Sequence, residues 1–341
     1  ISMENVTAQV MAAVKKNMDP VQALAAKKAA VAAIEKKSLK KTGLRSDVVS
    51  LYHGGEYWLY RYKKYTEVKL VFAPEQQAAF YGGDPDNFTF PRHDLDMTIF
   101  RAYEKGKPAK VQHYLKWNPK GAVDGELVFV SGHPGSTNRL MTLSQLQFQR
   151  DHSYPMRLKF FKRMLEVARE YASKGQEESR QALGMIFGIE NGLKVSTYEF
   201  EGLKAPGIME KKAAEEDEFR KLIEANPEWK AAYSDAWDQI AIAIEKQKSR
   251  MKEITFRRIP GLRLGGVATQ IVQLVAELKK PDGKRLEGYH DSQLDSLRFR
   301  LFSPAPIYPG FEEAMALNTL KLMQEELGDD DPYLKICLDG K

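Results

Sequence analysis

The sequence predicts an α+β fold in which a β-rich part precedes a helical part. From Asp47 onward, short runs rich in β-branched and aromatic residues alternate with turn residues, a pattern typical of antiparallel strands. After Thr142 the apolar residues take the spacing of long helices with charged faces. Because the strands come first and the helices follow, the order favours α+β architecture over an alternating, parallel α/β sheet.

The first 130 residues contain the expected strands. Residues 4–37 predict two helices that separate near Asp19 and Pro20, since proline is favoured in the first turn of a helix. Gly54 and Gly55 indicate a turn between the first two strands. The predicted strands are Val48–Tyr52, Glu56–Tyr62, Glu67–Phe72, Met97–Tyr103 and Leu127–Val130. Several short strands at this spacing are typical of a β-barrel or sandwich.

Helical segments separated by prolines make up the rest of the chain. They are Leu143–Ala172, Glu177–Ile189, Lys211–Glu224, Glu228–Ile254, Gly265–Lys279, Ser292–Phe302 and Phe311–Leu327. We therefore expect an N-terminal helical segment at residues 1–45, a β-rich part at 46–142 and an α-helical domain at 143–341.

The amino-acid composition argues against several classes of protein function. The net charge of +6 arises within residues 1–45, which carry nine Lys/Arg and three Asp/Glu and leave 43 of each sign elsewhere. This indicates a solvated lysine face rather than a nucleic-acid partner. The single cysteine, Cys337, excludes an intrachain disulfide and a cysteine-based zinc site, and no run approaches the roughly 18 apolar residues of a membrane span. The runs Glu35–Lys37 and Asp329–Asp331 are expected to be solvated.

The densest group of polar and turn residues lies at 81–101. Asp84, Asp86 and Asn87 are candidate calcium ligands, but the glycine and the closing glutamate of an EF-hand loop are missing at their offsets. A loop of this composition usually positions functional groups on a rigid scaffold. We predict no metal here.

Two interpretations of the same loop involve catalysis. His93 could pair with Asp94 or Asp96, although triad members normally come from separate elements. Asp96 begins the apolar run Met97–Phe100, and in chymotrypsin-like folds the aspartate that orients the histidine sits at such a loop-to-strand entry. An Asx turn or strand cap remains a purely structural alternative.

Three motifs, in order along the chain, resemble the bacterial dipeptidyl-peptidase seven and eleven family of chymotrypsin-like serine exopeptidases. The first runs from Gly82 to Arg101, Gly-Gly-Asp-Pro-Asp-Asn-Phe-Thr-Phe-Pro-Arg-His-Asp-Leu-Asp-Met-Thr-Ile-Phe-Arg, and resembles the family signature Gly-Gly-x-x-Asp-Asn-Trp-x-Trp-Pro-Arg-His-Thr-x-Asp-Phe-Ser. The others are Val128–Arg139 and Phe187–Lys194. The first motif is long and specific.

The resemblance implies roles for three residues. Asp96 matches the catalytic aspartate, and Asn87 matches the residue that binds the free α-amino group of the substrate. Phe88 stands where the family usually has tryptophan, which keeps an apolar wall but removes the indole N–H. Phe90 replaces the second tryptophan in the same way.

The resemblance also implies an architecture and an activity. The family's histidine and serine motifs do not occur in this sequence; Ser131 and Ser136 are expected to line a turn. We therefore expect an inactive central fragment: part of a chymotrypsin-like barrel, followed by a large inserted helical domain that caps the cleft. The whole enzyme would release dipeptides from oligopeptides with a free N-terminus.

The same resemblance implies that no metal or organic cofactor is needed. It also implies an extracytoplasmic location, in the periplasm or at the outer membrane, and a homodimer as the full-length protein. The alternative from another class is a non-catalytic peptide-binding or scaffold protein built from the helical region.

Overall fold

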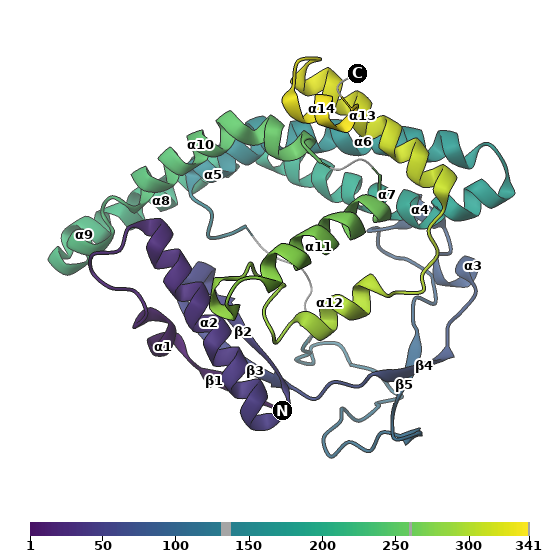
Figure 1. The fold of residues 1–341 in the computed structure, drawn as a ribbon, viewed down its shortest axis with the longest axis horizontal. Coiled ribbons are helices and arrows are strands. Elements are labelled where there is room, and N and C mark those ends of the chain that lie inside the picture. The colour runs from purple at the N-terminus through teal and green to yellow at the C-terminus, as the bar shows by residue number, and fades with distance from the viewer. Residues whose placement is uncertain (131–137, 259–260, 340–341) are drawn as a thin grey trace. The chain divides into compact units, whose positions relative to one another are not determined.

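The computed structural model describes residues 1–130, 138–258 and 261–339. Its residues form two compact units, one of residues 1–115 and 266–306 and the other of residues 116–265 and 307–341. Strands occur in the first part of the chain and helices dominate after residue 142, which confirms a mixed helix-and-strand fold (Figure 1). Whether residues 143–341 fold as a separable domain stays a prediction.

A three-stranded antiparallel sheet begins the first unit. Its order is β1 (Ser2–Asn5), β3 (Glu56–Tyr62) and β2 (Arg45–Leu51). The bounds of β3 are those predicted from its run of aromatic residues. The prediction of a helix from residue 4 was wrong at its start, because the edge of β3 offers backbone groups with which residues 2–5 pair as a strand.

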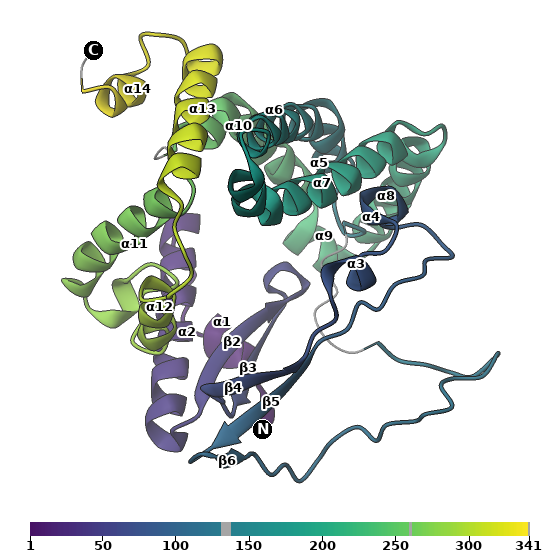
Figure 2. The same ribbon diagram turned by 90° about the vertical axis from the view of Figure 1, so that its right-hand side faces the viewer.

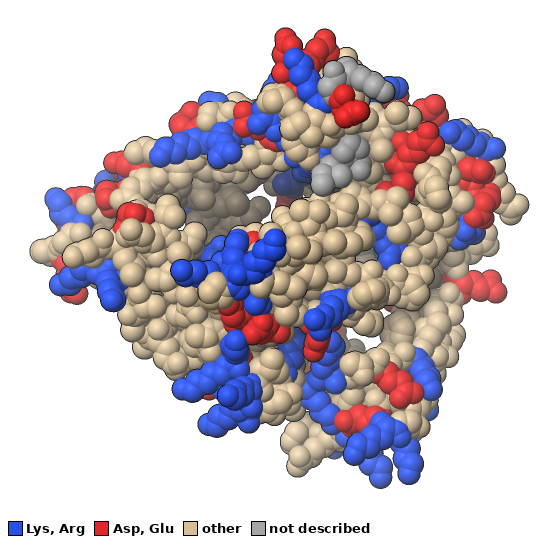
Figure 3. Space-filling view, in the orientation of Figure 1, with Lys and Arg blue, Asp and Glu red and all other residues tan. Residues whose placement is uncertain are grey.

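Two helices accompany this sheet, the short α1 (Thr7–Met11) and the long α2 (Pro20–Thr42). The side chain of Asp19 accepts the Gln22 N–H and the Gln22 side chain accepts the Asp19 N–H, so the start of α2 is closed by a capping box. Val6, Val10 and Leu59 form a buried cluster beneath these helices. The outer side of α2 carries exposed lysines, and Figure 3 shows Lys and Arg gathered over its C-terminal part.

Glu35 on α2 is buried, with 4% of its surface exposed, so the expectation that it is solvated was wrong. Its carboxylate accepts the Val48 N–H at 2.8 Å and the Ser292 hydroxyl at 3.1 Å. Burial raises the pKa of Glu35, and the hydrogen bond from Val48 acts in the opposite direction. These contacts join α2 to β2 and to the segment that precedes α12 (Leu294–Leu301).

The second sheet of this unit consists of β4 (Glu67–Phe72), β5 (Ile99–Glu104) and the two-residue β6 (Lys107–Pro108). Figure 2 shows β4 and β5 side by side, with β6 at the end of the hairpin. Both sheets have three strands, and neither closes into a barrel within the described residues. Helices α3 (Gln76–Ala79) and α4 (Gly83–Asp86) lie between β4 and β5 in the chain.

The predicted strand Leu127–Val130 is not a strand in the structure. Its four apolar side chains are 61% to 88% exposed. A strand requires a partner for its backbone groups, and no neighbouring strand within the described residues supplies one. Composition alone therefore gave a wrong prediction here.

Helices make up the second unit. They are α5 (Leu143–Phe148), a π-helical turn at Gln149–Ser153, α6 (Tyr154–Ala172), α7 (Gln176–Lys204), α8 (Ile208–Ala225), α9 (Pro227–Tyr233), α10 (Ala236–Phe256), α13 (Pro309–Leu327) and α14 (Pro332–Cys337). Helix α11 (Arg263–Leu278) begins here and continues into the first unit. The predicted helical segments are helical, although α7 extends 15 residues beyond its predicted end and the segment Glu228–Ile254 is divided between α9 and α10. None of the helices in the described ranges is both long and apolar enough to cross a membrane.

Helices α6 and α7 pack as an antiparallel pair. At Gly192 the α7 backbone comes so close to α6 that an added Cβ would lie 3.0 Å from the ring of Phe161. Tyr171 stacks against Phe311 of α13 with ring centres 4.9 Å apart. The core of this unit therefore joins α6 and α7 to a helix more than 100 residues later in the chain.

Glu312 of α13 closes the start of α11. Its carboxylate accepts the N–H groups of Leu262, Arg263 and Leu264 at 2.8, 2.8 and 3.2 Å, and 8% of the residue is exposed. The first N–H groups of a helix have no partner within the helix, and its N-terminus favours negative charge. A carboxylate from another helix therefore supplies both the hydrogen-bond acceptors and the negative charge.

We predict that Glu312→Ala lowers the free energy of unfolding by roughly 1.5–3 kcal/mol, the range for hydrogen bonds to a charged group. Glu312→Gln keeps one accepting oxygen and should lose less. Urea unfolding followed by helical circular dichroism measures both. Glu313→Ala, at the exposed neighbouring position, is the matched control; an equal loss there would contradict the capping role.

Candidate functional site in the loop before β5

The loop between α3 and β5 starts with a tight turn that needs glycine. Gly82 has φ +81°, and a Cβ at this position would lie 1.9 Å from Oδ2 and 2.9 Å from Cβ of Asp86. The side chain of Asp86 thus lies against the Gly82 backbone. After this turn, the Asn87 N–H bonds to the Asp84 carbonyl at 3.2 Å and the Thr89 N–H to the Asp86 carbonyl at 3.0 Å.

The returning part of the loop is tied to α3. The Leu95 N–H donates to the Ala78 carbonyl at 2.8 Å. The guanidinium of Arg92 lies over the ring of Phe80, 5.4 Å from its centre. These contacts connect the two ends of the loop, so the residues between them are held at defined positions.

Arg92 links two other side chains of the loop. Its Nη1 donates to Oδ1 of Asn87 at 3.2 Å, and its Nη2 forms an ion pair with Oδ2 of Asp94 at 2.7 Å. The Arg92 and Asp94 side chains are only 21% and 14% exposed. The structure therefore brings Asn87 together with two residues to which the sequence assigned no role in binding.

The other predicted site residues face outward. Phe88 is 61% exposed and Phe90 is 97% exposed, while Asp96 is exposed three residues before β5. His93 is exposed and makes no hydrogen bond with Asp94 or Asp96 within the described residues. A His–Asp pair between neighbours is therefore not formed, and Asp96 is accessible to a partner from elsewhere.

Asp84, Asp86 and Asn87 are the candidate calcium ligands of this loop. In the part of the chain that the structure describes, no group of three or more His, Cys, Asp and Glu side chains is placed to hold a metal ion. The described segments therefore add no such group of ligands to these three residues. Ser131, Ser136 and the glycines between them lie outside the described residues.

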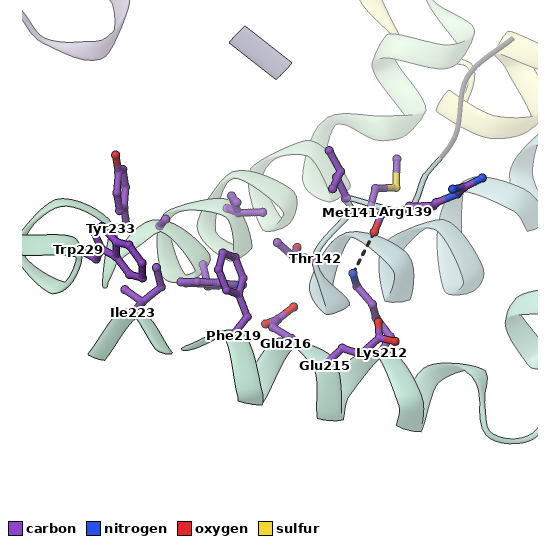
Figure 4. A pocket seen from close by; sticks show the side chains of 14 residues that line it. Arg139, Met141, Thr142, Lys212, Glu215, Glu216, Phe219, Ile223, Trp229 and Tyr233 are labelled. Atoms are coloured by element: carbon purple, nitrogen blue, oxygen red, sulfur yellow. Dashed lines mark hydrogen bonds between the residues drawn. The ribbon is translucent and has the colours of Figure 1, made fainter. Parts of the chain in front are cut away.

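A cavity of about 630 Å³ lies in the second unit. Figure 4 shows its aromatic end, with Phe219, Trp229 and Tyr233, and its charged end, with Lys212 and Glu215. The cavity has the size and apolar lining of sites that bind small molecules or side chains. Among the described residues that line it, none is a histidine, cysteine or serine.

A model of one protein family, Peptidase S46, matches residues 1–341. The chain belongs to the Peptidase S46 family. The resemblance drawn from the three sequence motifs is thereby confirmed.

Two curated relatives of this Peptidase S46 chain illustrate the similarity. An Asp/Glu-specific dipeptidyl-peptidase of Shewanella putrefaciens is 31% identical over 271 residues, which cover 75% of this chain and 36% of the relative. Dipeptidyl-peptidase 7 of Phocaeicola vulgatus is 25% identical over 329 residues, which cover 88% of this chain and 45% of the relative. The chain thus spans less than half the length of these relatives.

Solved structures show the same fold. DPP11 of Porphyromonas endodontalis, in complex with the dipeptide Arg-Glu, matches with a TM-score of 0.64 and 22% identity over 96% of this chain and 48% of that chain. Its complex with the dipeptide Arg-Asp matches with a TM-score of 0.62 and 20% identity. At this level of identity the likeness concerns the fold alone.

Sequence reasoning predicted Asn87 and Asp96 as site residues of the Peptidase S46 chain, and these assignments stay predictions; it missed the hydrogen bond that links Asn87 to Arg92. Arg92 and Asp94 stand five and seven residues after Asn87, and no helical or strand period brings such positions together. The available signal was the charged pair Arg92 and Asp94 inside an otherwise turn-rich loop. The contact between Arg92 and Asn87 also depends on the turn at Gly82, which the sequence spacing does not describe.

We predict that Gly82→Ala destabilises the loop more than the same change at Gly106. Both glycines have positive φ, +81° and +74°, so the left-handed conformation should lower the free energy of unfolding of both variants by roughly 1–2 kcal/mol. Only Gly82 has a neighbour, Asp86, within contact distance of the added Cβ. Urea unfolding of the two variants gives the difference, and equal losses would refute the close packing against Asp86.

Proposed function

We propose that this chain is the central part of a serine-type dipeptidyl aminopeptidase that releases dipeptides from the free N-terminus of oligopeptides. The observation that carries the proposal is the family match over residues 1–341, together with a named dipeptidyl-peptidase 31% identical over 75% of the chain. The loop at 81–101 supports it, because Asn87 is half-buried and held by Arg92 while Asp96 is exposed.

In the proposed mechanism the second peptide bond of the substrate undergoes acyl transfer. A serine attacks the carbonyl carbon, and a histidine first accepts the serine proton and then donates it to the leaving amine. Both residues come from polypeptide outside this sequence. Asp96 accepts a hydrogen bond from the histidine, which selects its tautomer and stabilises the imidazolium.

Asn87 receives the α-ammonium group of the substrate. An amide carbonyl oxygen accepts hydrogen bonds from ammonium, and a fixed acceptor at this point measures two residues from the N-terminus. Phe88 provides an apolar wall beside it. No metal or organic cofactor takes part in this mechanism.

The exposed surface of the second sheet supports completion of a chymotrypsin-like barrel by further polypeptide. Leu70 lies opposite Phe100 and Val68 opposite Ala102, so these side chains share one face of the sheet. Val68, Leu70 and Phe100 are 52%, 60% and 61% exposed. Contiguous exposed apolar residues mark a surface that another element covers.

The proposal includes two features of the whole protein that follow from the family resemblance. One is an extracytoplasmic location, in the periplasm or at the outer membrane, where oligopeptides are digested. The other is a homodimer, which sedimentation of the protein expressed from the complete gene would detect.

The cavity lined by Phe219 and Trp229 favours the alternative, a non-catalytic peptide-binding protein. The two functions differ in a direct assay. We predict that the 341-residue chain alone does not cleave fluorogenic dipeptidyl substrates, whereas the protein expressed from the complete gene does. Turnover by the isolated chain that a serine-directed phosphonate abolishes would contradict the fragment proposal. Absence of turnover by the complete protein would favour the alternative.

We predict that Asp96→Asn in the complete protein lowers kcat by about 10⁴, as the analogous change does in a serine-protease triad. The change keeps the shape of the side chain but removes the charge that stabilises the imidazolium. Steady-state kinetics on one dipeptidyl substrate measures it. A loss below about tenfold, with the protein folded by circular dichroism, would remove Asp96 from the triad.

A further inference from the structure

The contact between Arg92 and Asn87 determines how the Asn87 amide is turned. An amide has one end that accepts hydrogen bonds and one end that donates them, whereas a guanidinium only donates. With Nη1 of Arg92 at 3.2 Å, the oxygen end must face Arg92, because the NH₂ end would place two donors against each other. Arg92 therefore removes the freedom of Asn87 to turn its amide by 180°.

The position of Arg92 is itself fixed from several directions. Asp94 holds Nη2 at 2.7 Å, and the ring of Phe80 lies against the guanidinium plane. The Arg92 Nε is buried and has no hydrogen-bond partner within the described residues, which is unfavourable in itself. The contacts with Asn87 and Asp94 must offset this cost.

Asp94 also neutralises the positive charge of Arg92. Without Asp94, Arg92 would place an unpaired cation beside the amide that receives a second cation, the ammonium group of the substrate. Two like charges next to the same amide repel each other. The side chains of both residues are largely shielded from water, which weakens screening. Paired with Asp94, the guanidinium orients Asn87 without presenting a net positive charge to the ammonium group.

We infer that Arg92 is a positioning residue that fixes the rotation of the Asn87 amide, so that Oδ1 accepts from Arg92 and from the substrate's free amino group, and that Asp94 neutralises Arg92 for this purpose. The inference rests on the proposed function and deepens it. It separates the loop into a recognition group of Asn87, Arg92 and Asp94 and a catalytic residue, Asp96.

The test compares substrates with free and N-acetylated termini in the protein expressed from the complete gene. The measured quantity is the ratio of kcat/KM for the free substrate to that for the acetylated one. Asn87→Ala should lower this ratio roughly 10- to 100-fold, as loss of a hydrogen bond to a charged group does. Arg92→Met should lower it about tenfold, mainly through KM, and Arg92→Lys, which keeps a donor, should recover part of the loss.

Two further variants separate positioning from simple loss of structure. If Arg92 acts through Asn87, the double variant Arg92→Met/Asn87→Ala is no worse than Asn87→Ala alone. Asp94→Asn leaves the guanidinium uncompensated and should raise KM for the free substrate more than for the acetylated one. Arg101→Met, which removes a guanidinium from an exposed position of β5, is the matched control and should not change the ratio.

Additive effects in the double variant would overturn the inference, as would equal losses for both substrates in Arg92→Met and Arg92→Lys. If Arg92→Met fails to fold, Arg92→Lys and Asp94→Asn test the inference instead, through the same ratio of kcat/KM for free and acetylated substrates. A wild-type protein that cleaves dipeptides while every Arg92 and Asp94 variant keeps the ratio refutes the inference alone. A wild-type protein that releases no dipeptides refutes the proposed function and the inference with it.

Discussion

In each unit of this chain a buried carboxylate accepts hydrogen bonds from other segments and so joins elements that lie apart in the sequence. In the second unit Glu312 accepts three N–H groups at the start of α11, about 50 residues away in sequence. In the first unit Glu35 accepts the Val48 N–H and the Ser292 hydroxyl, which is 257 residues distant. Backbone N–H groups that leave water must find an acceptor, and a carboxylate supplies a strong one. Removing Glu312 would leave three N–H groups without this acceptor, and removing Glu35 would leave one N–H group and one hydroxyl without it.

The sequence predicted those elements whose cause is local. Strand β3 follows from the run of aromatic residues over Glu56–Tyr62, and α2 begins where the Asp19 cap and Pro20 place its first turn. Elements that depend on a distant partner could not be predicted in this way. Residues 2–5 become a strand because β3 offers an edge, and Leu127–Val130 does not because no strand within the described residues pairs with it. Periodicity describes one segment at a time, whereas pairing depends on two.

The same distinction explains the errors about charged residues. Glu35 stands beside two lysines and Asp331 ends a run of three aspartates, so each was expected in water. Both are buried: Glu35 bonds to Val48, and Asp331 caps α14 and pairs with Arg257 at 2.7 Å. The hydrogen bond from Arg257 lowers the pKa of Asp331 below its usual value. In the candidate site, too, Asn87 and Asp96 could be found from a motif, but their surroundings depend on the fold of the loop.

The residues of the loop before β5 fall into two groups, one buried and in contact with the rest of the loop, the other exposed to solvent. Arg92 and Asp94 are largely buried and contact Phe80 and Asn87, so they restrict the conformations of the loop. Asp96 and Phe88 are exposed on the same stretch of chain. The proposed function needs both properties, because a recognition group that is held in place before binding loses less conformational freedom, and an aspartate that pairs with a histidine must be accessible to it. On this proposal the contacts of Asn87 with Arg92 restrict the group that would bind the ammonium. Asp96, which is exposed, would pair with a histidine supplied from outside the described loop.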